Sequence, residues 1–164
     1  MEQIKITIYG SPQGKKAPRS RHVKTKDGRE FNLVYSPKVT KNYENFIKSE
    51  YHRLYPGVFL DGAIYMAVIA YFPIPKSTSK KKMELMISGK IRPVVKPDYD
   101  NICKTAADGL KGLAFKDDSY IVDQLFRKYY SDRPRLEILL FPIRQGDIEI
   151  EMTPQFLIKS LKMF

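Results

Sequence analysis

The sequence predicts one α+β (mixed α/β) domain in which helices pack on a small mixed sheet, in the order strand, helix, strand, helix, strand, strand. Three observations support this fold class. The chain has 164 residues, the size of one compact domain. Its hydrophobic fraction of 43% is enough for one core. Segments in which apolar residues occur at every second position are separated by segments in which they recur with the period of a helix. No repeat or low-complexity tract interrupts them.

The first strand and the first helix follow from local patterns. Isoleucines at every second position of 4–8 predict a strand, and residues 31–35 could form a short returning strand. Ser36 as N-cap and Pro37 in the first turn then begin a helix, which the Pro-Gly pair at 56–57 ends. The predicted apolar face of this helix comprises Tyr43, Phe46, Ile47, Tyr51 and Leu54.

The middle of the chain predicts the central strand and two further helices. Residues 63–72 are almost continuously apolar, which is typical of a strand covered on both faces. A short helix is expected over 81–88. A longer helix is expected over 99–110, where Gly109 and Gly112 mark its end.

The last part of the chain predicts two strands and a tail. The strands cover residues 120–130 and 135–143, and the turn residues between them predict a hairpin. We therefore expect residues 1–143 to form one domain. Residues 144–164 form a C-terminal extension that includes an amphipathic helix, whose apolar face must cover another surface such as a second subunit.

The charge predicts a polyanionic partner. The net charge is +11 at pH 7 and the sequence pI is about 9.6. Residues 15–29 and 76–96 each hold seven basic residues against one acid. Either run alone could be a solvated loop, but two in one small domain favour phosphate binding. The candidate DNA-binding residues are Lys15, Lys16, Arg19, Arg21, Lys76, Lys80, Lys81, Lys82 and Lys96.

Several other classes of protein are disfavoured by composition. No segment approaches the ~18 apolar residues of a membrane span, and the first ten residues lack the pattern of a signal peptide, so we expect a cytoplasmic protein without a membrane partner. The single cysteine, Cys103, cannot form an internal disulfide and is expected to pack in a helix. His22 and His52 are too few and too scattered for a catalytic triad.

The most informative stretch is a pair of carboxylates followed by a lysine. Pro97 favours an extended backbone before it, so Asp98 and Asp100 can converge where an extended segment meets a helix. Asp100 or Asn101 is expected to cap that helix. Lys104 lies one helical turn after Asp100 and therefore returns to the same face.

A second acidic pair comes just before the predicted strand at 120–130. Asp117 and Asp118 can approach the first pair if that strand lies beside the helix start. A hard cation such as Mg²⁺ prefers several carboxylate oxygens, so Asp98, Asp100 and Asp118 form a candidate metal site for phosphodiester cleavage. Lys104 would stabilise the developing charge. Taken separately, the first pair is more often a helix cap and the second a turn former, and only the two pairs together favour a metal site.

These residues resemble the signature of the RusA Holliday junction resolvases of bacteria and prophages. The stretches 96–101 and 117–119, with Lys104 and Asp108 between them, carry the resemblance, which covers about residues 1–143. It implies a magnesium-dependent homodimer, with Mn²⁺ as a substitute, that resolves Holliday junctions and related branched DNA by paired symmetric nicks in recombination and repair.

The resemblance also implies a role for each matching residue. Asp98, Asp100 and Asp118 match the family's essential carboxylates, and Lys104 matches its essential lysine; Asp117 and Asn101 are secondary. The long basic arm, the lysine-rich insert and the tail depart from the family pattern, which concerns substrate preference more than chemistry. The PD-(D/E)xK nucleases fit less well, because no acid-x-Lys pair follows Asp118.

Two functions of other classes stay open on sequence grounds. The chain could be a non-catalytic basic DNA-binding protein whose acids are structural caps. It could also be an assembly protein, since aromatic residues form 12% of the chain and could serve subunit contacts.

Overall fold

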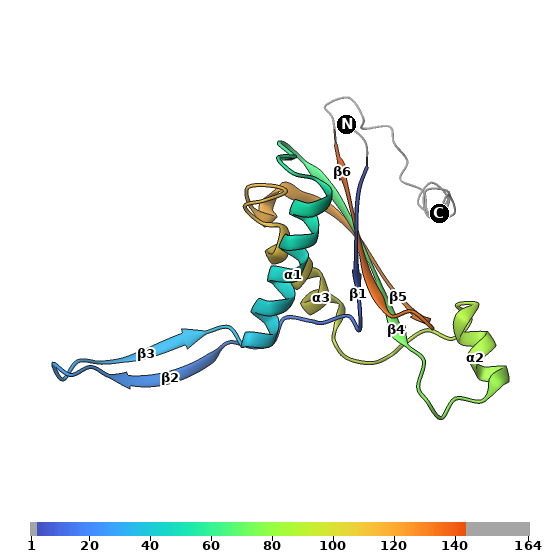
Figure 1. Cartoon of the computed structure of the whole chain (residues 1–164), viewed down its shortest axis with the longest axis horizontal. Helices are drawn as coiled ribbons and strands as arrows, with labels where there is room; N and C mark the ends of the chain where they lie inside the picture. The colour runs from blue at the N-terminus through green and yellow to red at the C-terminus, as the bar shows by residue number, and fades with distance from the viewer. Residues whose placement is uncertain (1–2, 144–164) are drawn as a thin grey trace.

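The structure is a computed structural model that describes residues 3–143 of the chain. The predicted C-terminal helix lies outside the described residues. Three helices and six strands are present within them, together with one short 3-10 helix. They form a sheet with helices packed against it (Figure 1), which confirms the α+β class.

The main sheet contains four strands in the order β1-β6-β4-β5. β1 (Ile4–Tyr9) pairs antiparallel with β6 (Arg135–Pro142), and β6 pairs antiparallel with β4 (Ile64–Pro73). β5 (Ile121–Ser131) runs parallel to β4 at the other edge. The predicted central strand is confirmed, because β4 is an interior strand and its apolar residues are almost all buried.

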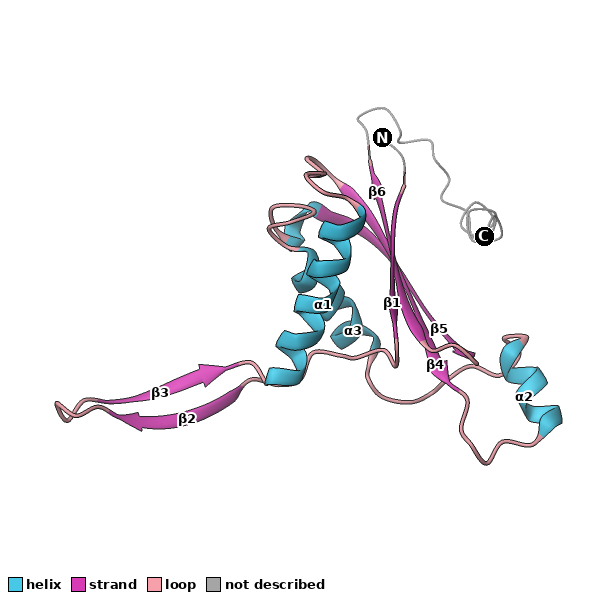
Figure 2. Ribbon diagram, in the orientation of Figure 1, coloured by secondary structure: helices cyan, strands magenta, loops and turns pink. Residues whose placement is uncertain are grey.

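Two helices pack over one face of this sheet, as Figure 2 shows. α1 (Lys38–Leu54) and α3 (Tyr99–Leu110) contact each other, and both contribute to the largest hydrophobic cluster. The isoleucines of β1 point into this cluster, in agreement with the predicted alternation. A third helix, α2 (Lys80–Ile87), lies beyond the end of the sheet close to β5.

The predicted hairpin between the last two strands is wrong. β5 and β6 are joined by a short turn, but β4 lies between them and pairs with both. The parallel β4–β5 pair is possible because the long connection between them contains α2 and α3. In this arrangement β4 has hydrogen-bond partners along both edges. A strand that is buried on both faces requires them, because its backbone N–H and C=O groups cannot bond to water.

The basic arm contains a strand that the sequence analysis did not identify. β2 (Arg19–Lys24) pairs antiparallel with β3 (Glu30–Tyr35) in a separate two-stranded hairpin. The hairpin extends away from the sheet and the helices (Figure 2). β2 carries mostly charged and polar residues, so its sequence lacks the apolar alternation from which strands are recognised.

The structure corrects the start of one helix and the role of one glycine. α1 begins at Lys38 with Pro37 at the N-cap position, one residue later than Ser36 as cap would require. Gly109 does not end α3 but lies inside it. A Cβ atom at Gly109 would come within 2.9 Å of the Cβ of Ile47 on α1, so the missing side chain allows the two helices to approach closely.

The predicted apolar face of α1 is confirmed in its central part. Ile47 and Tyr51 are fully buried, and Tyr43 packs against the same cluster. Phe46 and Leu54 are 46% and 41% exposed, so the face that the core covers is narrower than the sequence predicts.

Candidate active site

Asp98 and Asp100 lie at the start of α3, at the predicted junction between extended backbone and helix. Asp98 is the N-cap residue with extended backbone angles, and Asp100 lies in the first turn. The prediction that Asp100 or Asn101 caps the helix is wrong. The side chain of Asp98 accepts no capping hydrogen bond either. The carboxylates of both acids are exposed, so their oxygens remain accessible to a ligand.

Asp118 reaches the same region from the segment before β5. It begins a short 3-10 helix (Asp118–Tyr120) rather than a strand, and the Lys104 Nζ donates to the Asp118 Oδ2 at 2.5 Å. This bond raises the pKa of Lys104, because the neighbouring carboxylate favours the ammonium form. Asp100, Lys104 and Asp118 also line one cavity of about 270 Å³. The predicted approach of the second acidic pair to the first helix turn is therefore confirmed for Asp118.

Asp117 faces a different partner. Its carboxylate accepts from the backbone N–H of Ser119 and pairs with Lys111. These contacts, chiefly the one with Lys111, hold the pKa of Asp117 far below its usual range. Lys111 also lies 3.6 Å from Asp118, so one lysine that sequence reasoning missed contacts both acids. Its position directly after α3 was the available signal, because a residue there can reach the segment that follows.

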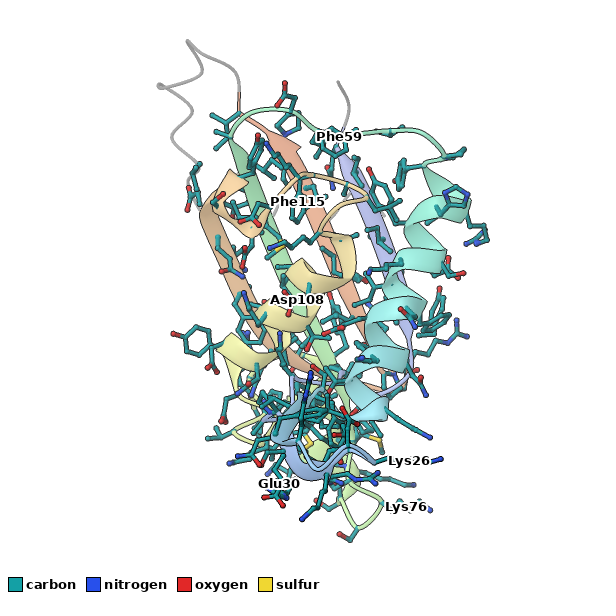
Figure 3. The ribbon with its side chains drawn as sticks, turned by 90° about the vertical axis from the view of Figure 1, so that its left-hand side faces the viewer. Lys26, Glu30, Phe59, Lys76, Asp108 and Phe115 are labelled. Atoms are coloured by element: carbon teal, nitrogen blue, oxygen red, sulfur yellow. The ribbon has the colours of Figure 1, made fainter. Side chains whose placement is uncertain are left out.

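Asp108 connects the site to the basic arm. The Lys15 Nζ donates to the Asp108 Oδ2, and the Lys104 Nζ lies 3.8 Å from the Asp108 Oδ1. Figure 3 labels Asp108 on α3, on the side of the molecule from which the hairpin projects. Lys15, Asp108, Lys104, Asp118, Lys111 and Asp117 thus form a row of alternating charges.

The backbone around Lys15 is fixed against α3. Its N–H donates to the carbonyl of Asn101 at 2.9 Å. The preceding residue, Gly14, is buried, and a Cβ atom there would lie 2.5 Å from the Cβ of Pro97. Only glycine permits this close approach of the arm to the residues before Asp98.

A second groove, of about 730 Å³, shares Tyr99 and Asp100 with the first cavity and is also lined by Asp98. The loop that forms one side of it is held by Lys128 of β5, whose Nζ donates to the carbonyls of Val95 and Pro97 at 2.7 Å each. Burial lowers the pKa of Lys128, while Asp98 acts in the opposite direction. Lys128 is a second positioning residue that the sequence analysis missed, because its strand pattern gave no indication of this contact.

The three acids of the predicted metal site are only partly brought together. Asp100 is shared by both cavities, whereas Asp98 lines one and Asp118 the other. Within residues 3–143, no cluster of three or more acidic, histidine or cysteine side chains forms a metal site, and Lys104 neutralises Asp118. The donor chemistry still fits a hard cation, because all three are carboxylates and those of Asp98 and Asp100 are not used as caps.

The candidate DNA-binding residues are exposed, with one exception. Lys15 is half-buried in its ion pair with Asp108. The exposed ones are Lys16, Arg19, Arg21, Lys76, Lys80, Lys81, Lys82 and Lys96. Lys80 to Lys82 form the first turn of α2. Cys103, in contrast, is buried in α3 as predicted, and burial raises its pKa to about 12.

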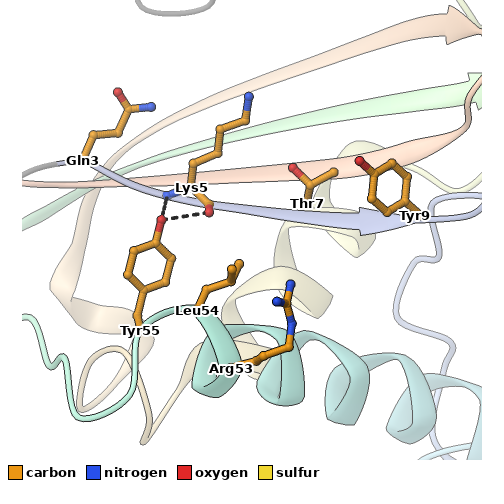
Figure 4. A pocket seen from close by; sticks show the side chains of 7 residues that line it. All are labelled: Gln3, Lys5, Thr7, Tyr9, Arg53, Leu54 and Tyr55. Atoms are coloured by element: carbon orange, nitrogen blue, oxygen red, sulfur yellow. Dashed lines mark hydrogen bonds between the residues drawn. The ribbon is translucent and has the colours of Figure 1, made fainter. Parts of the chain in front are cut away.

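Another cavity, of about 630 Å³, lies away from these acids. It is formed by β1 and the end of α1 (Figure 4), and none of its lining residues is acidic. The Tyr55 hydroxyl closes one side by accepting from the Lys5 N–H and donating to the Lys5 carbonyl, each at 3.0 Å. It therefore offers no carboxylate for a cation. No helix within residues 3–143 is long and apolar enough to cross a membrane.

A strongly basic α+β domain with exposed carboxylates and a lysine near one cavity has the groups that a nuclease uses to bind phosphates and hold a cation. The family model described as "Endodeoxyribonuclease RusA" matches residues 10–140, and the chain belongs to this family. It is also similar to a protein of Bacillus subtilis (strain 168) described as "Uncharacterized protein YqaN". The two are 35% identical over 142 residues, which cover 85% of this chain and 96% of that protein. The predicted family membership is confirmed.

Proposed function

We propose that the protein is a divalent-metal-dependent endonuclease that resolves Holliday junctions and related branched DNA by paired symmetric nicks, as a homodimer with Mg²⁺. One observation carries this proposal. Asp100, Lys104 and Asp118 line one cavity beside Asp98, in a chain with a net charge of +11. Family membership supports the nuclease activity.

Each residue has a role that follows from its place. Asp98, Asp100 and Asp118 would hold the cation, which supplies a Lewis acid and a water of lowered pKa. Lys104 is held at the cavity by its ion pairs with Asp118 and Asp108, so its ammonium is positioned where negative charge would develop on the phosphate. The exposed lysines of α2 and of the arm would bind the DNA backbone.

Asp117 and Lys111 are proposed as supporting residues. Lys111 pairs with Asp117 and approaches Asp118, so it fixes the turn that presents Asp118 to the cavity. Lys15 is likewise a positioning residue, because its ammonium is engaged by Asp108 rather than free for a phosphate.

The first test is nicking of a synthetic four-way junction by purified protein with Mg²⁺. Wild type should produce paired nicks, and Asp100→Asn should bind the junction without nicking it. EDTA should abolish nicking by wild type, and Mg²⁺ or Mn²⁺ should restore it. Asp61→Asn, which removes an exposed acid that lines neither cavity, is the matched control and should keep activity.

The alternative is a non-catalytic DNA-binding protein, and one observation favours it. Asp117 and Asp118 already have lysine partners, so they could be purely structural. In that case wild type would bind junctions but never nick them, and Asp100→Asn would change nothing that can be measured.

A further inference from the structure

The β2–β3 hairpin has two chemically different faces. Residues opposite each other in an antiparallel pair share a face, and successive residues alternate. The register pairs Arg19 with Tyr35, Arg21 with Leu33 and Val23 with Phe31. One face, here called the arginine face, therefore consists of Arg19, Arg21, Val23, Phe31, Leu33 and Tyr35. The opposite face, here called the mixed face, consists of Ser20, His22, Lys24, Glu30, Asn32 and Val34.

The two faces differ in how their charges are compensated. On the mixed face, the Lys24 Nζ lies 3.0 Å from Glu30 and the His22 Nε2 lies 3.7 Å from the same carboxylate. The arginine face has no acid. Neither Arg19 nor Arg21 forms an ion pair with any residue between 3 and 143. Two guanidinium groups are therefore left without a counter-charge on one side of the hairpin.

The arginine face also exposes a large apolar surface. Phe31, Leu33 and Tyr35 are 47%, 48% and 40% exposed. The hairpin projects away from the sheet and helices (Figure 2), and a two-stranded hairpin that packs on nothing is only marginally stable in water. An apolar surface in this position is stabilised when a ligand covers it.

We propose that the arginine face binds unpaired nucleotides at the branch point of a DNA substrate. A guanidinium fork binds phosphate oxygens in pairs, and aromatic rings stack on bases. The aromatic and apolar side chains opposite the arginines can stack on base faces, which are accessible only where bases are unpaired. A second copy of this chain fits less well, because its net charge of +11 would repel two uncompensated arginines. The inference takes only one element from the proposed function, namely that the DNA substrate is branched.

The test uses two variants that move a side chain from one face to the other without changing composition or net charge. Ser20→Arg with Arg21→Ser transfers one guanidinium to the mixed face. Val34→Tyr with Tyr35→Val transfers one aromatic ring. Arg21→Ser and Tyr35→Val alone are the simple losses, and circular dichroism establishes that each variant is folded.

Binding of the full chain is measured by fluorescence anisotropy without metal, on a four-way junction, an oligothymidine and a fully paired duplex. Both exchange variants should bind the junction and the oligothymidine roughly tenfold more weakly, as the simple losses do. Binding to the duplex should change less than about twofold. A 2-aminopurine at the branch point should lose its protein-dependent change in fluorescence with the Tyr35 exchange.

Three results would overturn the proposal. The exchange variants could bind every probe with the affinity of wild type, or they could lose affinity for all three probes by the same factor. Sedimentation velocity could instead show that they change the oligomeric state while DNA binding is kept, which would make the face a protein interface. The readout is binding, so a wild-type protein that never nicks DNA would refute the proposed nuclease but leave this result standing.

Discussion

Replacement of Asp108 by asparagine should destabilise the protein by about 1–2 kcal/mol. Removal of one partner costs up to about 1 kcal/mol for an exposed ion pair and about 3–5 kcal/mol for a buried one. The side chains of Asp108 and Lys15 are 18% and 30% exposed, so this pair falls between the two cases. Relief of repulsion against Glu44, whose pKa is raised by burial and by Asp108, offsets part of the loss.

The assay is urea unfolding followed by circular dichroism, with Asp61→Asn as the matched control. Asp61 is exposed, so its replacement should change stability by less than about 0.5 kcal/mol. A double-mutant cycle of Asp108→Asn with Lys15→Gln should give a coupling energy of roughly 1 kcal/mol. A coupling energy near zero, or equal effects of the two asparagine variants, would refute the role assigned to Asp108. On a four-way junction, Asp108→Asn should reduce turnover roughly fivefold while binding is kept, because Lys104 loses one of its two acidic neighbours.

Three further predictions concern the cation, the DNA and the core. Asp118→Asn should abolish nicking and hold or tighten junction binding, because it removes a ligand and a charge that repels phosphate, whereas Asp117→Asn should be milder. Neutralising Lys80–Lys82 should weaken binding to all DNA sequences. A plot of the logarithm of the binding constant against the logarithm of the salt concentration should become less steep, by about 0.9 for each lost phosphate contact. Gly109→Ala should destabilise the protein by about 1–3 kcal/mol through overpacking against Ile47, which outweighs the gain of roughly 1 kcal/mol in helix propensity.

Each of these has a contrary outcome. An active Asp118 variant beside an inactive Asp117 variant would place the wrong acid in the site. An unchanged salt slope after the lysine substitutions would mean that α2 is only solubilising. A Gly109→Ala protein with a higher urea midpoint than wild type would show that α1 and α3 separate at little cost.

The predicted elements that depend on local geometry agree with the structure. α3 spans Tyr99–Leu110 as expected, and Asp98 and Asp100 lie at its start, because the proline before them and the helical period after them act within a few residues. The family signature in the same stretch is local too, so the sequence could indicate the nuclease family before any contact was known. The cap was assigned wrongly because Asp98, Asp100 and Asn101 are all good capping residues, and local preference does not choose among them.

The features that the tertiary structure decided all join distant segments. Lys15 pairs with Asp108, which lies 93 positions later in the chain. An ion pair of Asp108 with another lysine or arginine of the arm would have a similar energy, so residue type alone does not select Lys15. β4 lies between β5 and β6 because its two edges need hydrogen bonds, whereas the short turn between the two later strands suggested a hairpin. The faces of the β2–β3 hairpin depend on register, which strand periodicity alone leaves undetermined. By itself, the sequence determined the elements other than β2 and the chemical groups of the site, because these follow from backbone period and residue type. Packing of the whole chain selected their partners.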